Sequence, residues 1–230
     1  MPRTNRIAPG GWVFHVLNRG NARGELFEDA GDYLAFEAVL GETVERLAMR
    51  LLAYCLMPNH WHMVVWPRED GDLGRFMQRL TVTHVRRWHL HRHSVGHGHV
   101  YQGLYKSFPI QQDGHFLTAC RYVERNALRA NLVQRAEDWR WSSLAVRRMT
   151  PAEAKRKEVP KLSDWPADRP RDWLRVVNKA QSEPEMEALR RAVQRGRPFG
   201  SPIWEKQAAT RLGLQSTLRP RGRPRKTGKQ

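Results

Sequence analysis

The chain has 230 residues, a formal net charge of +17 and a sequence pI of about 10.9. Hydrophobic residues make up 40% of it and charged residues 27%, which excludes a fully disordered chain and allows one sizeable domain with an appendage. The excess of positive charge favours a polyanionic partner, nucleic acid in the first place, and no apolar run approaches the ~18 residues that span a bilayer.

Residue periodicity divides the first part of the chain into strands and amphipathic helices. Runs of β-forming residues bounded by turn signals predict strands, and apolar stripes at a spacing of three and four residues predict helices. The predicted elements are, in chain order, a strand over 11–17, a helix from 29 to about 47, strands over 50–56 and 60–66, a helix over 71–90, a strand over 106–111 and a helix over 113–130. A hairpin between two helices predicts the ferredoxin-like α+β fold, an antiparallel sheet with helices packed on one face.

The composition changes near residue 149, where prolines begin to punctuate a charged stretch. We therefore expect one folded domain over 1–148 and a Pro-rich charged linker over 149–181. A two-helix extension is expected over 182–214, opened by a capping box of Ser182 and Glu185. Residues 215–230 are basic and contain no acid, so we expect a tail without a core of its own.

The two cysteines indicate the compartment. Cys55 and Cys120 both lie in apolar patterns and are expected to be buried free thiols of a reducing environment, with no disulfide. The basic N-terminus is not followed by the apolar segment of a secretory signal peptide, which agrees with a cytoplasmic protein.

The run Pro58-Asn59-His60-Trp61-His62 is the most informative pattern in the chain. In a strand, residues i and i+2 project from the same face, so His60 and His62 project together while Trp61 packs on the other side. Paired imidazoles on a rigid strand suit a metal ion, although two ligands leave the site incomplete. Taken alone, the pair is equally compatible with two polar residues on the solvent face of a half-buried strand.

The helix predicted over 113–130 offers further groups. Tyr122 and Asn126 are four residues apart, so they share one face of this helix, and they flank its apolar stripe. Side chains at such flanking positions lie at the rim between core and solvent, where they reach both the sheet and a substrate.

Together and in this order, the motifs resemble those of a known family. His60-Trp61-His62 resembles the His-hydrophobic-His motif of the single-tyrosine HUH endonucleases, and residues 122–126 (Tyr-Val-Glu-Arg-Asn) resemble their nucleophile helix. Further similarity to the REP-associated tyrosine transposases is found at 15–21, 98–107, 126–133 and 141–143, so that the resemblance covers roughly residues 10–145.

The resemblance implies an enzyme that nicks and joins single-stranded DNA at hairpin sequences such as repetitive extragenic palindromes. It implies that His60, His62 and Asn126 hold a divalent metal, Mg²⁺ or Mn²⁺, and that Tyr122 attacks phosphorus to form a 5′-phosphotyrosine intermediate. It also implies no nucleotide cofactor, no membrane partner, a monomer or homodimer, and a location in the bacterial cytoplasm at the nucleoid.

Several side chains are predicted to contact DNA: Asn18, Arg19, Lys106 and Arg129 in the folded domain, and Arg219, Arg221 and Arg223 in the tail. The tail run 219–224 resembles an AT-hook, whose arginines enter the narrow minor groove of A·T-rich DNA. A nonspecific basic tail is the alternative, and either one adds salt-dependent affinity for phosphates.

Other functions stay open at this point. A noncatalytic nucleic-acid-binding module of the same fold predicts exposed aromatic residues on two central strands, where His60 and His62 stand here. A replication-initiator nicking enzyme shares the site, but such proteins commonly carry a helicase region, and the chain has no Gly-rich phosphate loop. The His-rich stretch 84–99 also allows a structural zinc site, although no cysteine lies nearby.

Overall fold

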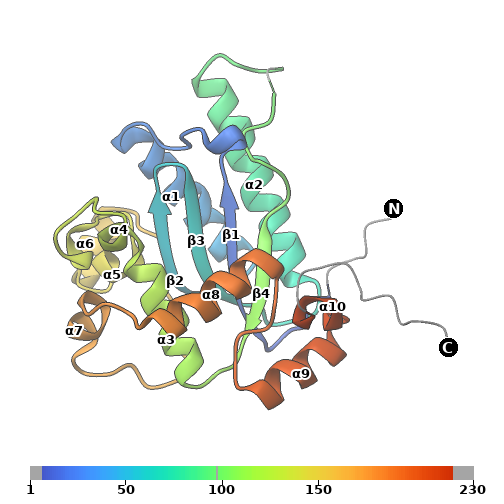
Figure 1. The fold of residues 1–230 in the computed structure, drawn as a ribbon. Helices are drawn as coiled ribbons and strands as arrows, with labels where there is room; N and C mark the ends of the chain where they lie inside the picture. The colour runs from blue at the N-terminus through green and yellow to red at the C-terminus, as the bar shows by residue number, and fades with distance from the viewer. Residues whose placement is uncertain (1–6, 97, 220–230) are drawn as a thin grey trace.

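The computed structural model describes residues 7–96 and 98–219. Four strands, β1 (Val13–Arg19), β2 (Arg50–Met57), β3 (His60–Trp66) and β4 (Lys106–Ile110), form one antiparallel sheet in the order β2-β3-β1-β4 (Figure 1). Helix α1 (Ala30–Arg46) connects β1 to β2, and α2 (Asp72–His91) connects β3 to β4. This order of elements and strands confirms the predicted ferredoxin-like α+β fold.

Helices α1 and α2 cover one face of the sheet, as predicted. Asp29 caps the first turn of α1, where its carboxylate accepts hydrogen bonds from the backbone N–H groups of residues 31 and 32. Phe36 of α1 and Phe76 of α2 are fully buried in the same core cluster as Trp61, and the Phe36 and Trp61 ring centroids are 6.0 Å apart. Trp61 therefore projects to this face, which leaves His60 and His62 to project to the other.

The opposite face is covered by α3 (Gly114–Glu124) and by elements from the C-terminal part of the chain. In Figure 1, α3 and α8 (Glu183–Arg195) lie in front of the sheet and α1 lies behind it. Phe116 of α3, Val177 of α7 (Trp173–Asn178) and Leu189 of α8 are buried in one cluster with the strands. The sheet is thus buried on both faces, and its β3 histidines face the α3 layer.

Part of the segment predicted to be a linker, 149–181, packs against the core. Trp165 donates its indole N–H to the carbonyl of Leu52 at 2.8 Å, and the backbone N–H of Ser163 donates to Leu51 at 2.8 Å. Trp173 is buried in the cluster beneath α3. The large apolar surface that these tryptophans bury explains why a Pro-rich charged stretch packs against the sheet. Where the chain divides into domains stays a prediction.

The remaining helices are short: α4 (Asn126–Arg129), α5 (Ser143–Val146), α6 (Pro151–Arg156), α9 (Pro202–Arg211) and α10 (Gln215–Leu218). The capping box of Ser182 and Glu185 opens α8 as predicted, and α9 is the second predicted helix of the extension. Cys55 and Cys120 are buried free thiols. Within residues 7–96 and 98–219, no helix has the length and apolar character required to cross a membrane.

A buried carboxyl group lies in the core between α1 and the sheet. Glu37 is 3% exposed, Tyr54 donates its hydroxyl to Glu37 Oε1 at 2.5 Å, and burial raises the pKa of Glu37 to about 7. Since an exposed glutamate has a pKa near 4.5, the folded protein retains a proton that the unfolded chain releases. The contribution of Glu37 to stability is therefore full below about pH 4.5 and is lost as the pH rises through 7.

Replacing this carboxyl group by an amide is expected to remove the loss of stability at high pH. The free energy of unfolding of Glu37→Gln, relative to the wild type, is expected to increase by about 3 kcal/mol between pH 4.5 and pH 8. Urea denaturation of both proteins at the two pH values measures this change. A stability difference that is the same at both values contradicts the buried, protonated state of Glu37.

Candidate active site

His60 and His62 stand at the start of β3, on the face covered by α3. Their ring centroids are 5.1 Å apart, and His62 is 4% exposed. Burial lowers the pKa of His60 to about 4, with help from the positive charges of Arg19 and Arg129, and burial also lowers the pKa of His62. Both imidazoles are therefore neutral at pH 7, and each keeps one nitrogen lone pair for a ligand.

Tyr122 of α3 lies directly beside this pair. Its ring meets the His62 ring edge to face, with centroids 5.6 Å apart, and the residue is 6% exposed. The N-terminus of α3 is capped by Asp113, which accepts a hydrogen bond from the backbone N–H of His115 at 2.8 Å. The helix predicted to carry the nucleophile thus brings Tyr122 to the sheet face where the histidines project.

Polar contacts fix the end of α3 that carries Tyr122. Glu124 is fully buried and accepts hydrogen bonds from the Ser143 hydroxyl at 2.6 Å and from the Trp173 indole at 2.7 Å. Arg121 and Arg125 donate to backbone carbonyls of residues 177–180, which include the last carbonyls of α7. Contacts with α5 and α7 therefore fix the position of α3 on the sheet.

Asn126 lies four residues after Tyr122. It is the first residue of α4, which is separated from α3 by Arg125. It is 2% exposed, and its Oδ1 accepts a hydrogen bond from Arg129, whose guanidinium carbon stands 4.3 Å over the Tyr122 ring. Among the described residues, its Nδ2 has no hydrogen-bond partner. The free Nδ2 is a hydrogen-bond donor that fits an oxygen acceptor such as a phosphate, and Oδ1 is the amide atom that can coordinate a cation.

The donor types at this place suit a divalent cation with a preference for oxygen and nitrogen ligands. Two neutral imidazoles and an amide leave room for phosphate and water oxygens, which such ions retain in catalytic sites. Within the described ranges, no group of three or more His, Cys, Asp and Glu side chains is placed to hold a metal ion. That Asn126 is a third metal ligand therefore stays a prediction.

Two of the predicted DNA contacts lie beside the histidines. Arg19 is the cross-strand neighbour of His60 in the β1–β3 register, and its Nε is buried without a partner in the part of the chain that is described. Arg129 contacts both Tyr122 and Asn126. Both guanidinium groups bring positive charge close enough to lower the pKa of His60.

Asn18 is not brought to this site, because neighbouring residues of a strand face opposite ways. Its side chain accepts from the backbone N–H of Arg19 at 2.9 Å and donates to the carbonyl of Gly103 at 3.4 Å. It lines a groove of about 880 Å³ between α2 and residues 98–105, together with Val82 and Tyr105.

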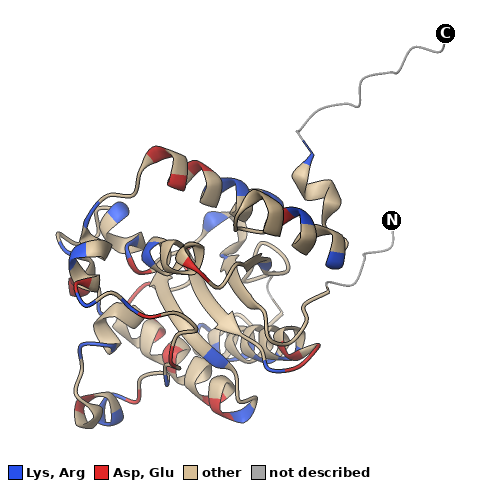
Figure 2. Ribbon diagram, turned by 90° about the horizontal axis from the view of Figure 1, so that it is seen from below, with Lys and Arg blue, Asp and Glu red and all other residues tan. Residues whose placement is uncertain are grey.

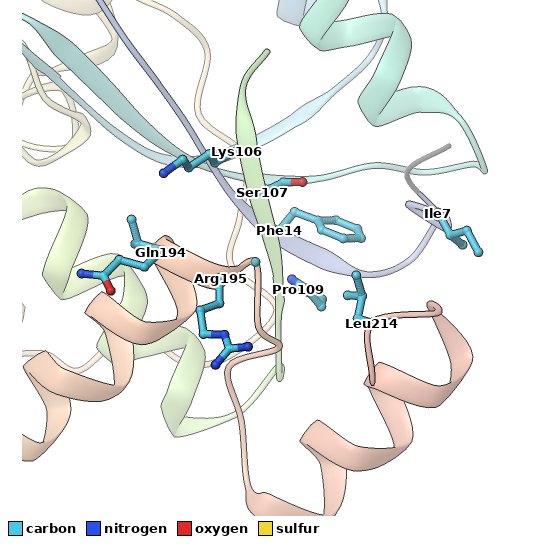
Figure 3. Close-up of a pocket in the computed structure, with 10 residues that line it drawn as sticks. Ile7, Phe14, Lys106, Ser107, Pro109, Gln194, Arg195 and Leu214 are labelled. Atoms are coloured by element: carbon cyan, nitrogen blue, oxygen red, sulfur yellow. The ribbon is translucent and has the colours of Figure 1, made fainter. Parts of the chain in front are cut away.

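Lys106 lies at the start of the edge strand β4, in a separate pocket of about 290 Å³ between β4 and the C-terminal helices. Gln194 and Arg195 of α8 line the same pocket, and Figure 3 shows Lys106 on the α8 side of the strand. Acidic residues mark the first turns of α8 and arginines its last turns, a charge division that Figure 2 shows along the helix. Sequence analysis did not single out Arg195, although the arginine-rich run 190–197 was the available signal.

Of the predicted tail contacts, only Arg219 belongs to the described residues. Arg219 is exposed at the last described position, and Arg221 and Arg223 lie outside the described residues.

His15 is a member of the site that periodicity did not reveal. It is fully buried on β1, its Nε2 is 2.9 Å from His62 Nδ1, and its ring centroid is 6.3 Å from that of Tyr122. Leu17 is the cross-strand partner of His62, and His15 lies two residues before Leu17 on the same strand. Both histidines therefore face the same side of the sheet.

Comparisons with known proteins identify a family. The family model of the IS200-like transposases matches residues 11–126, a range that contains the two β3 histidines and Tyr122 and ends at Asn126. No curated protein matches the sequence significantly.

Solved structures that are similar to this chain include two transposases. A REP-associated tyrosine transposase bound to a REP hairpin has a TM-score of 0.50 and 16% sequence identity, with 79% of this chain and 93% of that chain covered. A transposase candidate from Deinococcus radiodurans R1 has a TM-score of 0.37 and 14% identity, with 58% of this chain and 92% of that chain covered. The first likeness shows a shared fold. Since the family model spans half of the chain and includes the site just described, the protein belongs to the family of IS200-like transposases.

Proposed function

We propose that this transposase is a metal-dependent, single-tyrosine endonuclease and strand transferase that cleaves single-stranded DNA at hairpin sequences of the REP type. The observation that carries the proposal is the placement of Tyr122 against His62, with Arg129 linking Tyr122 to Asn126. The net charge of +17 and the REP hairpin bound by the fold relative support a DNA hairpin as substrate.

Tyr122 supplies the nucleophile. Its phenolic oxygen forms a bond to the scissile phosphorus while the bond from phosphorus to the 3′ oxygen breaks, and the phenolic proton passes to water. The leaving 3′ oxygen keeps the electron pair and takes up a proton, which gives a free 3′-hydroxyl and a 5′-phosphotyrosine. A 3′-hydroxyl that attacks this phosphotyrosine rejoins the strands without ATP, because the link conserves the phosphodiester bond energy.

The side chains around Tyr122 have separate tasks. His60, His62 and Asn126 hold the divalent metal, Mg²⁺ or Mn²⁺, which when bound polarises the scissile phosphate and stabilises charge on its non-bridging oxygens. Arg129 stacks over the Tyr122 ring and holds the ring in place. Arg19 adds positive charge beside His60, where a phosphate lies during the reaction.

We infer that the DNA backbone continues past the active site to the β4–α8 pocket. Lys106 and Arg195 provide two positive charges there, and each phosphate contact adds salt-dependent affinity. Asn18, in the groove beside α2, and the tail residues Arg219, Arg221 and Arg223 remain predicted DNA contacts.

A noncatalytic module that stacks bases on its sheet is less well supported. The central strands β1 and β3 bury Phe14 and Trp61 in the α1–α2 core, and their other face carries histidines beneath α3. Neither face presents the exposed aromatic pair that base stacking requires.

The function is tested with the full-length protein and single-stranded DNA that carries a hairpin of the REP type. With Mn²⁺, we expect a covalent protein–DNA adduct that survives denaturing electrophoresis and that does not form when EDTA is present from the start. The same DNA with one hairpin arm scrambled is expected to give little adduct. Binding of the hairpins without any covalent product, with either Mg²⁺ or Mn²⁺, contradicts the proposal and favours a noncatalytic module.

A further inference from the structure

Each of the two β3 histidines has its Nδ1 atom engaged by a second side chain. Asn59 Oδ1 is 2.7 Å from His60 Nδ1, and His15 Nε2 is 2.9 Å from His62 Nδ1. Within the described ranges, no hydrogen bond engages the Nε2 atom of either ring. The same nitrogen of both rings is therefore left for a metal.

The contact of Asn59 fixes the tautomer of His60. Asn59 Nδ2 donates to the backbone carbonyl of Arg23 at 3.2 Å, so the oxygen of the amide is the atom that faces His60. An amide oxygen only accepts hydrogen bonds, which requires the proton of His60 to sit on Nδ1. The Nε2 atom of His60 then carries the lone pair that a metal needs.

The contact of His15 with His62 has no such fixed direction. A hydrogen bond between two imidazole nitrogens contains one proton, and either ring can donate it. When His15 donates, a neutral His62 carries its own proton on Nε2 and cannot bind a metal through that atom. When His62 donates, its Nε2 has a free lone pair, and the proton of His15 sits on Nδ1.

The surroundings of His15 suit a neutral acceptor. The residue is fully buried, its ring stacks on Phe108 with centroids 4.7 Å apart, and its Nδ1 has no partner among the described residues. A neutral imidazole in this buried position has one lone pair to offer to the Nδ1 proton of His62. No aspartate or glutamate contact competes with His62 for this ring in the described part of the chain.

We propose that His15 and Asn59 are positioning residues of the metal site, each accepting the Nδ1 proton of one metal-binding histidine. His15 thereby selects the tautomer of His62 whose Nε2 lone pair is free. This inference rests on the metal-dependent function proposed above, and neither residue touches the metal or the DNA. Because Asn59 can only accept while His15 can also donate, His60 is held in the binding tautomer at all times, whereas His62 adopts it fully when the metal binds.

Two substitutions of His15 separate the hydrogen bond from the packing. His15→Phe keeps a ring against Phe108 but removes the acceptor, and His15→Gln restores an acceptor. In calorimetric titrations of full-length protein with Mn²⁺, without DNA, His15→Phe is expected to lower the affinity by about 10- to 100-fold, and His15→Gln to remain close to the wild type. Thermal melts followed by circular dichroism verify that both variants are folded.

A matched control is available in the other core. His84 is also a buried histidine whose Nδ1 is engaged, at 2.7 Å from the Tyr101 hydroxyl, but it lies on the α1–α2 side of the sheet. His84→Phe is expected to keep the wild-type affinity for Mn²⁺. An equal loss of affinity in His84→Phe and His15→Phe indicates general destabilisation and overturns the positioning role.

The tautomers are read directly from long-range ¹H–¹⁵N NMR spectra of the imidazoles, recorded with and without saturating Mg²⁺. We expect His60 in the Nδ1–H form in both states and His62 to shift to the Nδ1–H form when Mg²⁺ is added. An Nε2-protonated His62 in the Mg²⁺-bound protein, or wild-type Mn²⁺ affinity in His15→Phe, overturns the proposal. Failure to cleave DNA leaves these results unchanged and affects only the proposed function, whereas a wild-type protein that binds no Mn²⁺ overturns both.

Discussion

Tyr122→Phe is expected to abolish the covalent DNA adduct and strand transfer, with a rate loss on the order of 10³-fold or more, because the substitution removes the attacking oxygen. The ring contacts of Tyr122 with His62 and Arg129 involve the aromatic ring and are retained in phenylalanine. Hairpin affinity, measured by fluorescence anisotropy, is therefore expected to stay close to the wild type. Denaturing electrophoresis of the reaction with Mn²⁺ measures the adduct.

Tyr105→Phe is the matched control for this substitution. Tyr105 lies in the Gly-bounded segment 98–107, and it lines the groove beside α2. The nearby Tyr101 is buried, and its hydroxyl is hydrogen-bonded to Trp61 and His84. Tyr105→Phe is expected to form the adduct normally. An adduct that persists in Tyr122→Phe and is lost in Tyr105→Phe places the nucleophile on the other side of the sheet.

The second large effect is expected at the histidines. His60→Ala removes one of the three proposed ligands, so we expect Mn²⁺-dependent cleavage to fall by on the order of 10²-fold or more while the hairpin still binds. His60 is the better choice for this test because His62 is more deeply buried and its removal leaves His15 without a partner. Single-turnover cleavage at a fixed Mn²⁺ concentration, with hairpin affinity measured in parallel, gives the comparison.

His89→Ala provides the control for the histidine substitution. His89 belongs to the His-rich stretch that allowed a zinc site, and its Nδ1 is 2.9 Å from the Ser94 hydroxyl at the end of α2. Wild-type cleavage by His89→Ala together with a loss in His60→Ala supports the assigned ligands. Wild-type cleavage by His60→Ala together with a loss in His89→Ala contradicts the assigned ligands and indicates a metal site in the His-rich stretch.

The strands and helices of the first part of the chain were predictable because each has a clear period and a chemical boundary. Trp61 between His60 and His62 fixed which way the histidines face, since a tryptophan that packs on one core sends its neighbours to the opposite side. The four-residue spacing of Tyr122 and Asn126 predicted one shared helical face, but α3 ends at Glu124 and Asn126 begins α4, and Arg129 contacts both side chains. Such patterns are local, and they are visible in the sequence because each element buries one face in a core.

The parts that sequence analysis did not predict depend on contacts between distant residues. The packing of residues 163–177 rests on Trp165 reaching Leu52 and on Trp173 reaching Glu124, which no local period encodes. The role of His15 requires the register of β1 against β3. The same register separates Asn18 from Arg19, so that of these two predicted DNA contacts only Arg19 lies beside the histidines.

The central claim, that Tyr122 carries the DNA through a covalent bond, is tested most directly by mass spectrometry of the wild-type adduct. After nuclease trimming, trypsin cuts after Arg121 and Arg125 and releases residues 122–125, in which Tyr122 is the only hydroxyl-bearing side chain. We expect the added nucleotide mass on this short peptide, attached to Tyr122 through a 5′-phosphate. The same mass on the peptide His93–Lys106, which contains Tyr101 and Tyr105, contradicts the account.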